Sequence, residues 1–180
     1  IFSTSDISSG TATTLGLFPL GIVGTPAKPT FSMLAWGDSR TAGSGDSPSN
    51  TSGGLGYFER ACFNVDDSGR AIPFSNLSKS GDVATTYDVD EAFARYAIFP
   101  YAQSILFSLG VNDISSGRTY NQVVASFEEA LAHAEIHGLI IMVATIAPYT
   151  TSTDSWVTVA NQTVVAGYES TGLRGQLNDY

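Results

Sequence analysis

Short apolar runs alternate along the chain with segments in which apolar residues recur every three or four positions. The short runs have the length of buried strands and lie at 31–36, 71–78, 104–110 and 139–146. The periodic segments predict helices at 55–65, 89–99 and 119–137, and a further helix begins within 172–180. Apolar strands that alternate with helices indicate a parallel sheet covered on both faces. The pattern therefore predicts an α/β fold, in which a central parallel sheet lies between two layers of helices.

The longest predicted helix is amphipathic. Its apolar side comprises Val124, Phe127, Leu131 and Ala134. We expect this side to face the sheet. Gly138 follows the helix and can adopt the left-handed backbone that ends one.

Two parts of the chain follow neither period. Residues 1–30 combine loop residues with one apolar piece at 15–23, and we expect an N-terminal lead-in or edge segment before a single domain at 31–180. The residues after Pro148 are polar around Trp156 and predict a long loop.

The length and composition fit one domain with a substantial core. The 180 residues are 43% hydrophobic and 11% aromatic, and a chain of this size buries roughly 70% of its unfolded surface. The single cysteine, Cys62, excludes an internal disulfide. Its place four residues after Phe58 in the helix 55–65 predicts that its side chain is buried.

The charge of the chain excludes two classes of partner. Seventeen acidic and eight basic residues give a formal net charge of −9, so we expect no nucleic acid and no anionic membrane as partner. The longest apolar stretch, 138–148, is shorter than the roughly 20 residues of a membrane span. A chain rich in Thr, Ser and Gly and poor in Lys is typical of extracellular, cell-surface or virion-associated proteins, and we expect such a location.

Chemically useful residues come directly after three of the predicted strands. The run FSMLAWGDSRTAG (31–43) leaves its strand at Gly37 and presents Ser39 on a tight turn. Gly81 follows the second strand, and Asn112 follows the third. The carboxyl ends of parallel strands share one edge of the sheet, where α/β proteins bind ligands. We therefore expect the three residues to lie together.

Ser39 has the setting of a nucleophile. A serine hydroxyl reacts only when its position is fixed and a base removes its proton. Gly37 permits the turn, and Asp38 can hold it through backbone hydrogen bonds. Attack on an ester carbonyl creates an oxyanion, which needs preorganised hydrogen-bond donors. A glycine at 81 leaves room for close backbone approach, which a Cβ would obstruct.

These residues resemble the first three blocks of a known family. Gly37-Asp38-Ser39, Gly81 and GVND (110–113) match the SGNH, or GDSL-type, hydrolases in order and in their placement after successive strands. The resemblance extends from Phe31 to Tyr180. It implies a flavodoxin-like three-layer α/β/α sandwich with a central parallel sheet.

The resemblance implies a serine esterase that forms an acyl-enzyme at Ser39. The oxyanion donors would be the backbone amides of Ser39 and Gly81 and the side-chain amide of Asn112, with Asp38 and Asp113 in supporting roles. The implied substrate is a small acyl ester, acetyl first, as a small molecule or on a glycan. No metal or organic cofactor is implied.

The family's last block, Asp-x-x-His, supplies the catalytic base and is absent from these 180 residues. The two histidines, His133 and His137, fall on the side of helix 119–137 that we expect to face outward, together with Glu129. We interpret this group as a solvated polar face, since structural metal sites need more ligands. We therefore expect a C-terminally incomplete SGNH domain. Its base would lie in a missing segment or on a second polypeptide, and the chain alone would be nearly inactive.

Other interpretations stay open. The domain could be a catalytically silent carbohydrate-binding or structural module without the histidine. A flavodoxin-like nucleotide-binding domain would need a phosphate-binding loop, and GDSRTAGSG (37–45) lacks the Lys-Ser/Thr of a P-loop. Ser39, Gly81 and Asn112 could each be an ordinary turn or cap residue. A second Gly-Asp-Ser, at 45–47, follows no predicted strand, and we interpret it as coincidence.

Overall fold

A four-stranded parallel sheet forms the centre of the molecule. The computed structural model describes residues 23–25, 30–46, 56–63, 71–87 and 89–180. The sheet has the order β2-β1-β3-β4, with β1 (Met33–Gly37), β2 (Phe74–Asn76), β3 (Ser104–Ser108) and β4 (Ile140–Val143). All four predicted strands are present, each shorter than its apolar run. The predicted α/β sandwich with a central parallel sheet is confirmed.

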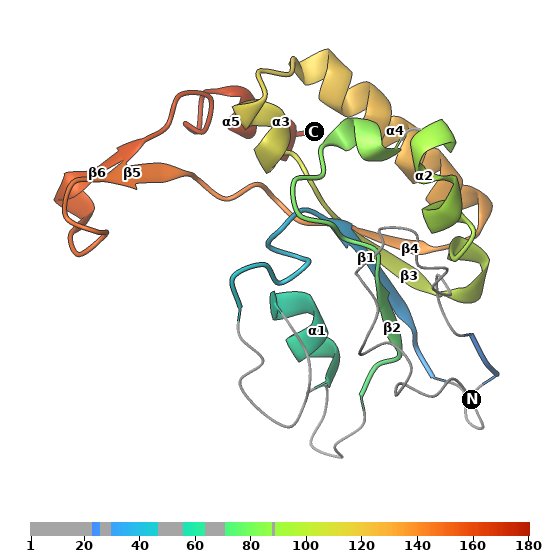
Figure 1. The fold of residues 1–180 in the computed structure, drawn as a ribbon. Helices are drawn as coiled ribbons and strands as arrows, with labels where there is room; N and C mark the ends of the chain where they lie inside the picture. The colour runs from blue at the N-terminus through green and yellow to red at the C-terminus, as the bar shows by residue number, and fades with distance from the viewer. Residues whose placement is uncertain (1–22, 26–29, 47–55, 64–70, 88) are drawn as a thin grey trace, which may run out of the picture.

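Helices flank this sheet (Figure 1). Four of them occupy predicted segments: α1 (Gly56–Phe63), α2 (Val89–Tyr96), α4 (Tyr120–Ile136) and α5 (Leu173–Asn178). The short elements between them are α3 (Val111–Ser115) and the 3-10 turns η2 (Ala84–Tyr87), η3 (Phe99–Tyr101) and η4 (Val159–Asn161).

One face of the sheet carries the larger core, beneath α2 and α4 (Figure 1). Trp36 of β1 is fully buried there. Its ring meets three others nearly edge-on, with centroid distances of 4.7 Å to Tyr87, 5.3 Å to Tyr96 and 6.3 Å to Phe99. The guanidinium of Arg95 lies 5.0 Å from the centre of the Trp36 ring. Aromatic and cation–π contacts stabilise particular ring arrangements, in addition to the stabilisation that comes from burying apolar surface. These contacts therefore hold β1 in position.

The opposite face is covered by α1. Ala35 of β1 is buried with Phe58 and Cys62, which confirms the predicted burial of the cysteine. Burial raises the pKa of the Cys62 thiol. Among the described residues β4 pairs only with β3, and two of its apolar side chains are exposed, Ile140 by 59% and Val143 by 55%.

Helix α4 is turned relative to the predicted apolar side. Its buried residues are Val123, Ser126, Ala130 and Ala134. Of the predicted side only Ala134 is fully buried, and the other three members are half-buried. The helix contacts η2 as well as β4, so its buried side points between the two elements. Gly138, with φ of 67°, follows the helix as predicted.

The segment after Pro148 is a β-hairpin rather than the predicted loop. Its strands β5 (Thr150–Ser152) and β6 (Gln162–Val164) are antiparallel, with Ser152 opposite Gln162. Figure 1 shows the hairpin projecting away from the rest of the molecule. The prediction was wrong because threonine favours strands while the segment lacks the apolar alternation that marks a half-buried strand. We call residues 149–165 the arm.

The lead-in predicted at 1–30 lies largely outside the described residues, so its boundary with the domain stays a prediction. In the described part of the chain, every helix is too short or too polar to cross a membrane.

Replacement of Gly37 by alanine should destabilise the protein. A Cβ at this position would lie 2.8 Å from the carbonyl oxygen of Ser108 and would press on the Thr41 side chain. We expect Gly37→Ala to lower the free energy of unfolding by about 1–3 kcal/mol, measured by urea denaturation. Gly24→Ala is the matched control, because a Cβ there meets no described atom within 4 Å. Equal losses in the two variants would contradict this account.

Candidate active site

Ser39 lies on the turn that ends β1. The Asp38 backbone N–H donates to the Ser108 carbonyl at 3.3 Å, which joins the turn to the end of β3. The Asp38 carboxylate accepts from the Arg40 N–H at 2.9 Å, and its carbonyl accepts from the Ala42 N–H at 2.9 Å. Asp38 therefore holds the turn as the sequence indicates, and the half-buried Ser39 side chain sits on a fixed backbone.

The loop after β2 lies directly against this turn. The Ser78 hydroxyl accepts from the Gly37 N–H at 2.8 Å, and the Lys79 N–H donates to the Gly37 carbonyl at 3.2 Å. Gly81 follows with φ of 86°, in the left-handed region that favours glycine. A Cβ on Gly81 would meet no described atom within 4 Å, so the glycine is required by its backbone angle rather than by lack of space.

Asn112 lies in α3, which follows β3 through a left-handed Gly110 with φ of 114°. Its side-chain Nδ2 donates to the Asp82 carbonyl at 2.8 Å. The Asn112 amide is therefore held against the residue that follows Gly81. The second hydrogen of this amide has no partner among the described residues.

Hydrogen bonds thus connect all three strand-end loops at one edge of the sheet. The turn at 37–39 is bonded to the loop at 78–79 and to the end of β3, and α3 is bonded to the loop at 81–82. The structure brings together the segments that carry the three predicted site residues, whose catalytic roles stay predictions.

Asp113 supports this arrangement from beneath. It is fully buried, and its Oδ1 accepts from the Ala84 N–H at 2.8 Å and lies 3.5 Å from the Arg118 guanidinium. Its other oxygen, Oδ2, has no hydrogen-bond partner among the described residues. Burial raises the pKa of the Asp113 carboxyl, and the bond from Ala84 and the charge of Arg118 oppose this rise.

Sequence reasoning missed two residues that position the Ser39 loop. The Asn76 side-chain amide donates to the Thr41 carbonyl at 2.9 Å and to the Glu59 carboxylate at 3.1 Å. The Tyr57 hydroxyl lies 2.9 Å from the Thr41 hydroxyl. Asn76 is the last residue of β2 but lies inside the predicted strand 71–78, so the sequence did not mark it, and nothing local marks Tyr57.

Both histidines lie away from Ser39. The His133 ring packs 4.2 Å from the Tyr96 ring, and the His137 ring lies 6.3 Å from Phe99. His133 is half-buried rather than outward, because α2 covers that side of α4. The C-terminal end of α4 leads into the start of β4, so both histidines lie toward the opposite edge of the sheet.

The second Gly-Asp-Ser has a structural use. Asp46 accepts from the Gly56 N–H at 2.9 Å and from the Arg60 guanidinium at 2.8 Å, so it anchors the start of α1. Ser47 lies outside the described residues. No group of three or more His, Cys, Asp or Glu side chains in the described part of the chain is arranged to hold a metal ion.

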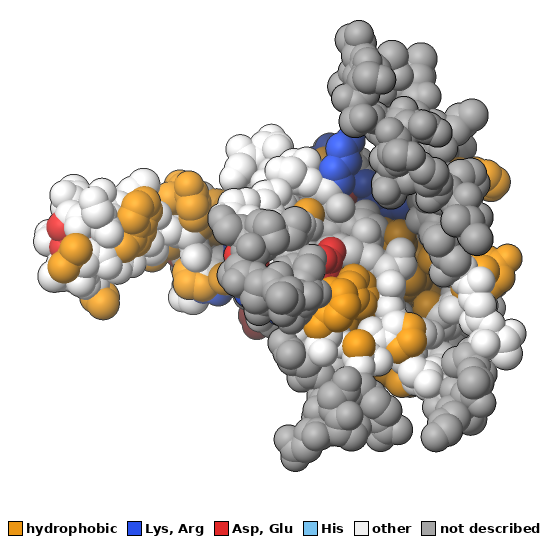
Figure 2. Space-filling view, turned by 60° about the horizontal axis from the view of Figure 1, so that its bottom comes forward, with side chains coloured by type: hydrophobic (Ala, Val, Ile, Leu, Met, Phe, Trp, Pro, Cys, Tyr) orange, Lys and Arg blue, Asp and Glu red, His pale blue; other side chains and the backbone are white. Residues whose placement is uncertain are grey.

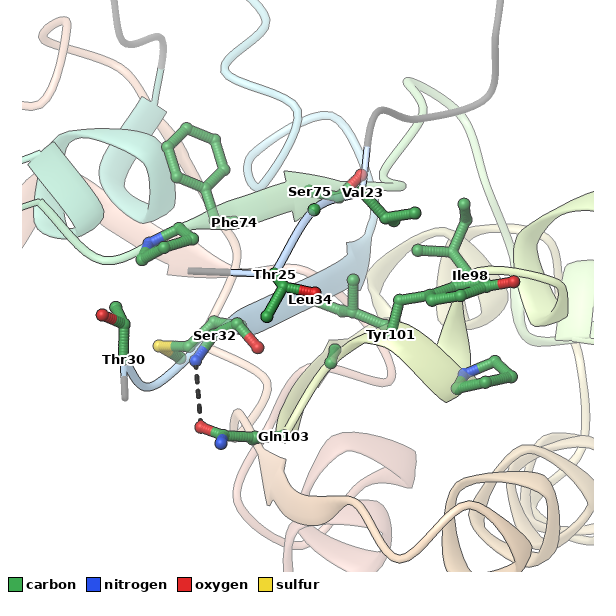
Figure 3. Close-up of a pocket in the computed structure, with 15 residues that line it drawn as sticks. Val23, Thr25, Thr30, Ser32, Leu34, Phe74, Ser75, Ile98, Tyr101 and Gln103 are labelled. Carbon is green, nitrogen blue, oxygen red and sulfur yellow. Dashed lines mark hydrogen bonds between the residues drawn. The ribbon is translucent and has the colours of Figure 1, made fainter. Parts of the chain in front are cut away.

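Described residues line two hollows that border the sheet. The larger, about 910 Å³, lies among Ser32, Phe74 and Gln103 at the amino ends of the strands (Figure 3), opposite to the edge that carries Ser39. The smaller, about 360 Å³, lies between α4, β4 and α5 and is lined mainly by apolar side chains. Gly110 borders it, so the smaller hollow adjoins the turn that leads to Asn112.

No family model and no curated protein matches the sequence. Solved structures match the fold. AlinE4, an esterase of the SGNH-hydrolase family, superposes with a TM-score of 0.55 and 18% identity, over 68% of this chain and 62% of AlinE4.

Two other solved enzyme structures are similar in fold to this chain. The psychrotrophic esterase EstA from Pseudoalteromonas sp. matches with a TM-score of 0.51 and 18% identity, over 64% of this chain and 60% of EstA. The lipase Lip_vut3 from a goat rumen metagenome matches with a TM-score of 0.53 and 14% identity, over 66% of this chain and 65% of the lipase. The chain therefore has the fold of the SGNH-type hydrolases, and it spans less than two thirds of each of these enzymes.

The buried carboxyl of Asp113 should make stability depend on pH. A pKa raised by folding stabilises the protonated form, so this contribution is present below the ordinary pKa of 3.8 and is lost as pH rises through the folded value. Asp113→Asn cannot ionise and keeps an oxygen for the Ala84 N–H. We expect the melting temperature of the native protein, relative to Asp113→Asn, to fall as pH rises from about 3.5 to about 7.

Asp154 provides a control, because we expect its contribution to the melting temperature to change with pH in the opposite direction. Hydrogen bonds from Thr158, Asn161 and Ser152 lower the pKa of its carboxyl, so its contribution is lost as pH falls. Relative to Asp154→Asn, the native protein should therefore gain in melting temperature as pH rises. Parallel pH profiles for native protein and Asp113→Asn would contradict the role given to Asp113.

Proposed function

We propose that the chain is the nucleophile-bearing part of a serine esterase that hydrolyses small acyl esters, acetyl esters first. The observation that carries this proposal is the set of hydrogen bonds joining the Ser39 turn, the Gly81 loop and the Asn112 helix at one sheet edge. The likeness in fold to SGNH esterases and a lipase supports the same class of reaction.

In the proposed reaction Ser39 Oγ attacks the ester carbonyl and its proton passes to a histidine base. The carbonyl oxygen becomes an oxyanion that accepts from the backbone amides of Ser39 and Gly81 and from Asn112 Nδ2. The bond to the alcohol then breaks, and the alcohol leaves with the proton from the base. Water hydrolyses the acyl-serine by the same steps in reverse order, which releases the acid and restores Ser39.

The orientation of Asn112 fits the proposed donor role. One hydrogen of its amide is used by the Asp82 carbonyl, which fixes the plane of the group. The other hydrogen is then preorganised before the substrate arrives, which is the property that makes such donors effective.

The catalytic base is the component that the described residues do not supply. His133 and His137 lie toward the other edge of the sheet, so we propose that an Asp-x-x-His segment outside residues 1–180 completes the site. This segment would lie in the same polypeptide or in a second one. The proposed chemistry uses no metal or organic cofactor.

The substrate we propose is soluble, either a small ester or an acetylated glycan. The catalytically silent module is the second candidate, and the position of the two histidines favours it if no Asp-x-x-His segment joins the domain. Esterase assays distinguish the two.

Removal of the Ser39 hydroxyl should abolish activity. We expect residues 1–180 alone to hydrolyse p-nitrophenyl acetate at the background rate, and a full-length protein that includes the proposed Asp-x-x-His segment to hydrolyse it readily. In the full-length protein Ser39→Ala should reduce turnover to background, because no nucleophile remains. Ser47→Ala, in the second Gly-Asp-Ser, is the matched control and should retain turnover. Full turnover in Ser39→Ala together with loss of turnover in Ser47→Ala would show that Ser39 is not the nucleophile.

Loss of the Asn112 amide should slow the chemical step. Asn112→Ala should lower kcat by about 100- to 1000-fold with little change in KM, since the donor acts once charge develops. Asn112→Asp keeps the shape but cannot donate, and it should lose as much. A rise in KM with unchanged kcat would exclude the oxyanion role.

A further inference from the structure

The arm begins at the same edge of the sheet that carries Ser39. The chain leaves the carboxyl end of β4 at Val143, and the arm follows at 149–165. Its base is anchored where the Tyr149 ring packs 5.4 Å from the buried ring of Tyr168. Beyond this contact the hairpin projects into solvent (Figure 1).

The tip of the arm is held by an unusually complete set of hydrogen bonds around Asp154. The Asp154 carboxylate accepts from the Thr158 N–H and hydroxyl at 3.0 and 2.7 Å and from the Asn161 amide at 3.0 Å. The Ser152 hydroxyl donates to the same carboxylate at 2.7 Å. These bonds lower the pKa of Asp154. The tip is therefore a fixed turn stabilised by an ionised side chain.

This turn forces an unfavourable backbone on two residues that are not glycine. Ser155 and Trp156 have φ of 58° and 61°, in the left-handed region that such residues rarely adopt. Outliers of this kind persist where the surroundings over-determine them and cluster at functional sites. Here the hydrogen bonds around Asp154 impose the conformation, and its result is the placement of the Trp156 side chain.

The Trp156 side chain combines a bonded indole N–H with high exposure. Its Nε1 donates to the Thr150 hydroxyl at 3.2 Å, so the polar edge of the indole is already satisfied within the arm. The residue is nevertheless 60% exposed. A fixed, exposed aromatic face with its N–H occupied offers stacking rather than hydrogen bonding.

The chemistry around Trp156 narrows the class of partner. The arm contains no Lys or Arg, and Asp154 is its only charged side chain, so nothing in it attracts a phosphate or an anionic lipid surface. The arm also exposes four other large hydrophobic residues, Tyr149, Val157, Val159 and Val164. Figure 2 shows hydrophobic side chains beside polar ones along the arm. Thr153 and Thr163 are also exposed.

We propose that the arm binds a neutral saccharide, with Trp156 as the stacking platform. The apolar face of a sugar ring carries C–H groups of partial positive charge, which suit the negative face of an indole. Sugar hydroxyls can exchange hydrogen bonds with the neighbouring threonines. This binding does not require a reactive Ser39. If the proposed esterase activity holds, the arm would retain a glycan that carries the ester.

The two tryptophans of the chain make the proposal directly measurable. Trp36 is fully buried and Trp156 is exposed, so ligand-dependent changes in tryptophan emission report on the arm. The probes are xylohexaose, cellohexaose and the hexamer of N-acetylglucosamine, with an oligogalacturonate of the same length as an anionic comparison. We expect saturable quenching and a blue shift with at least one neutral oligosaccharide, in the native protein and equally in Ser39→Ala.

Variants of the arm separate stacking from other effects. Trp156→Ala should weaken binding of that oligosaccharide at least tenfold by calorimetry, and Trp156→Phe should retain part of it. Val159→Ala removes an exposed apolar side chain of the same arm and should change affinity less than twofold. Urea denaturation of all three variants shows whether the fold is preserved.

Three results would overturn the proposal. The first is the absence of saturable binding to every neutral oligosaccharide. The second is a blue shift with phosphatidylcholine vesicles in place of sugars, which would assign the arm to a lipid surface. The third is a blue shift that follows protein concentration together with dimers in sedimentation, which would assign it to a second copy. Loss of ester hydrolysis with intact sugar binding would instead overturn only the proposed function.

Discussion

The close packing around Gly37 is the constraint on which the candidate site depends. The peptide groups of this residue bond to Ser78 and Lys79, and the next N–H bonds to Ser108. A side chain at 37 would fall between Ser108 and Thr41. Three loops can therefore meet only because the backbone of β1 reaches the edge without a Cβ. The tight turn that carries Ser39 likewise depends on a residue without a Cβ at position 37.

The site loops rest on charged groups that connect them to the core. Asp82 is buried beside Gly81 and bonds to Arg95 at 2.6 Å, and Arg95 lies over the Trp36 ring. Asp113 holds the other side through the Ala84 backbone. Groups that must keep their geometry during a reaction benefit from such second supports. Asp82 is buried and Arg95 is half-buried, so loss of the arginine would leave the buried carboxylate without its partner.

Much of the fold follows from local sequence, and so does the position of the loops that carry the candidate site residues. The apolar runs predicted the four strands. Because Ser39, Gly81 and Asn112 follow three of these strands, the sequence also predicted that their loops lie at one edge of the sheet. The arm was missed because its polar strands make no core and so carry no apolar period. The rotation of α4 was missed because η2 covers part of it. Asn76 and Tyr57 act on Thr41 from other elements, and such long-range partners leave no local pattern.

The uncovered side of β4 has a consequence for the chain when it is purified by itself. Within the described residues this strand offers one row of backbone N–H and C=O groups to solvent beside the exposed Ile140 and Val143. Unprotected sheet edges with apolar side chains template pairing between molecules. Edge-to-edge association through β4 is therefore the expected route by which concentrated preparations of these 180 residues lose solubility.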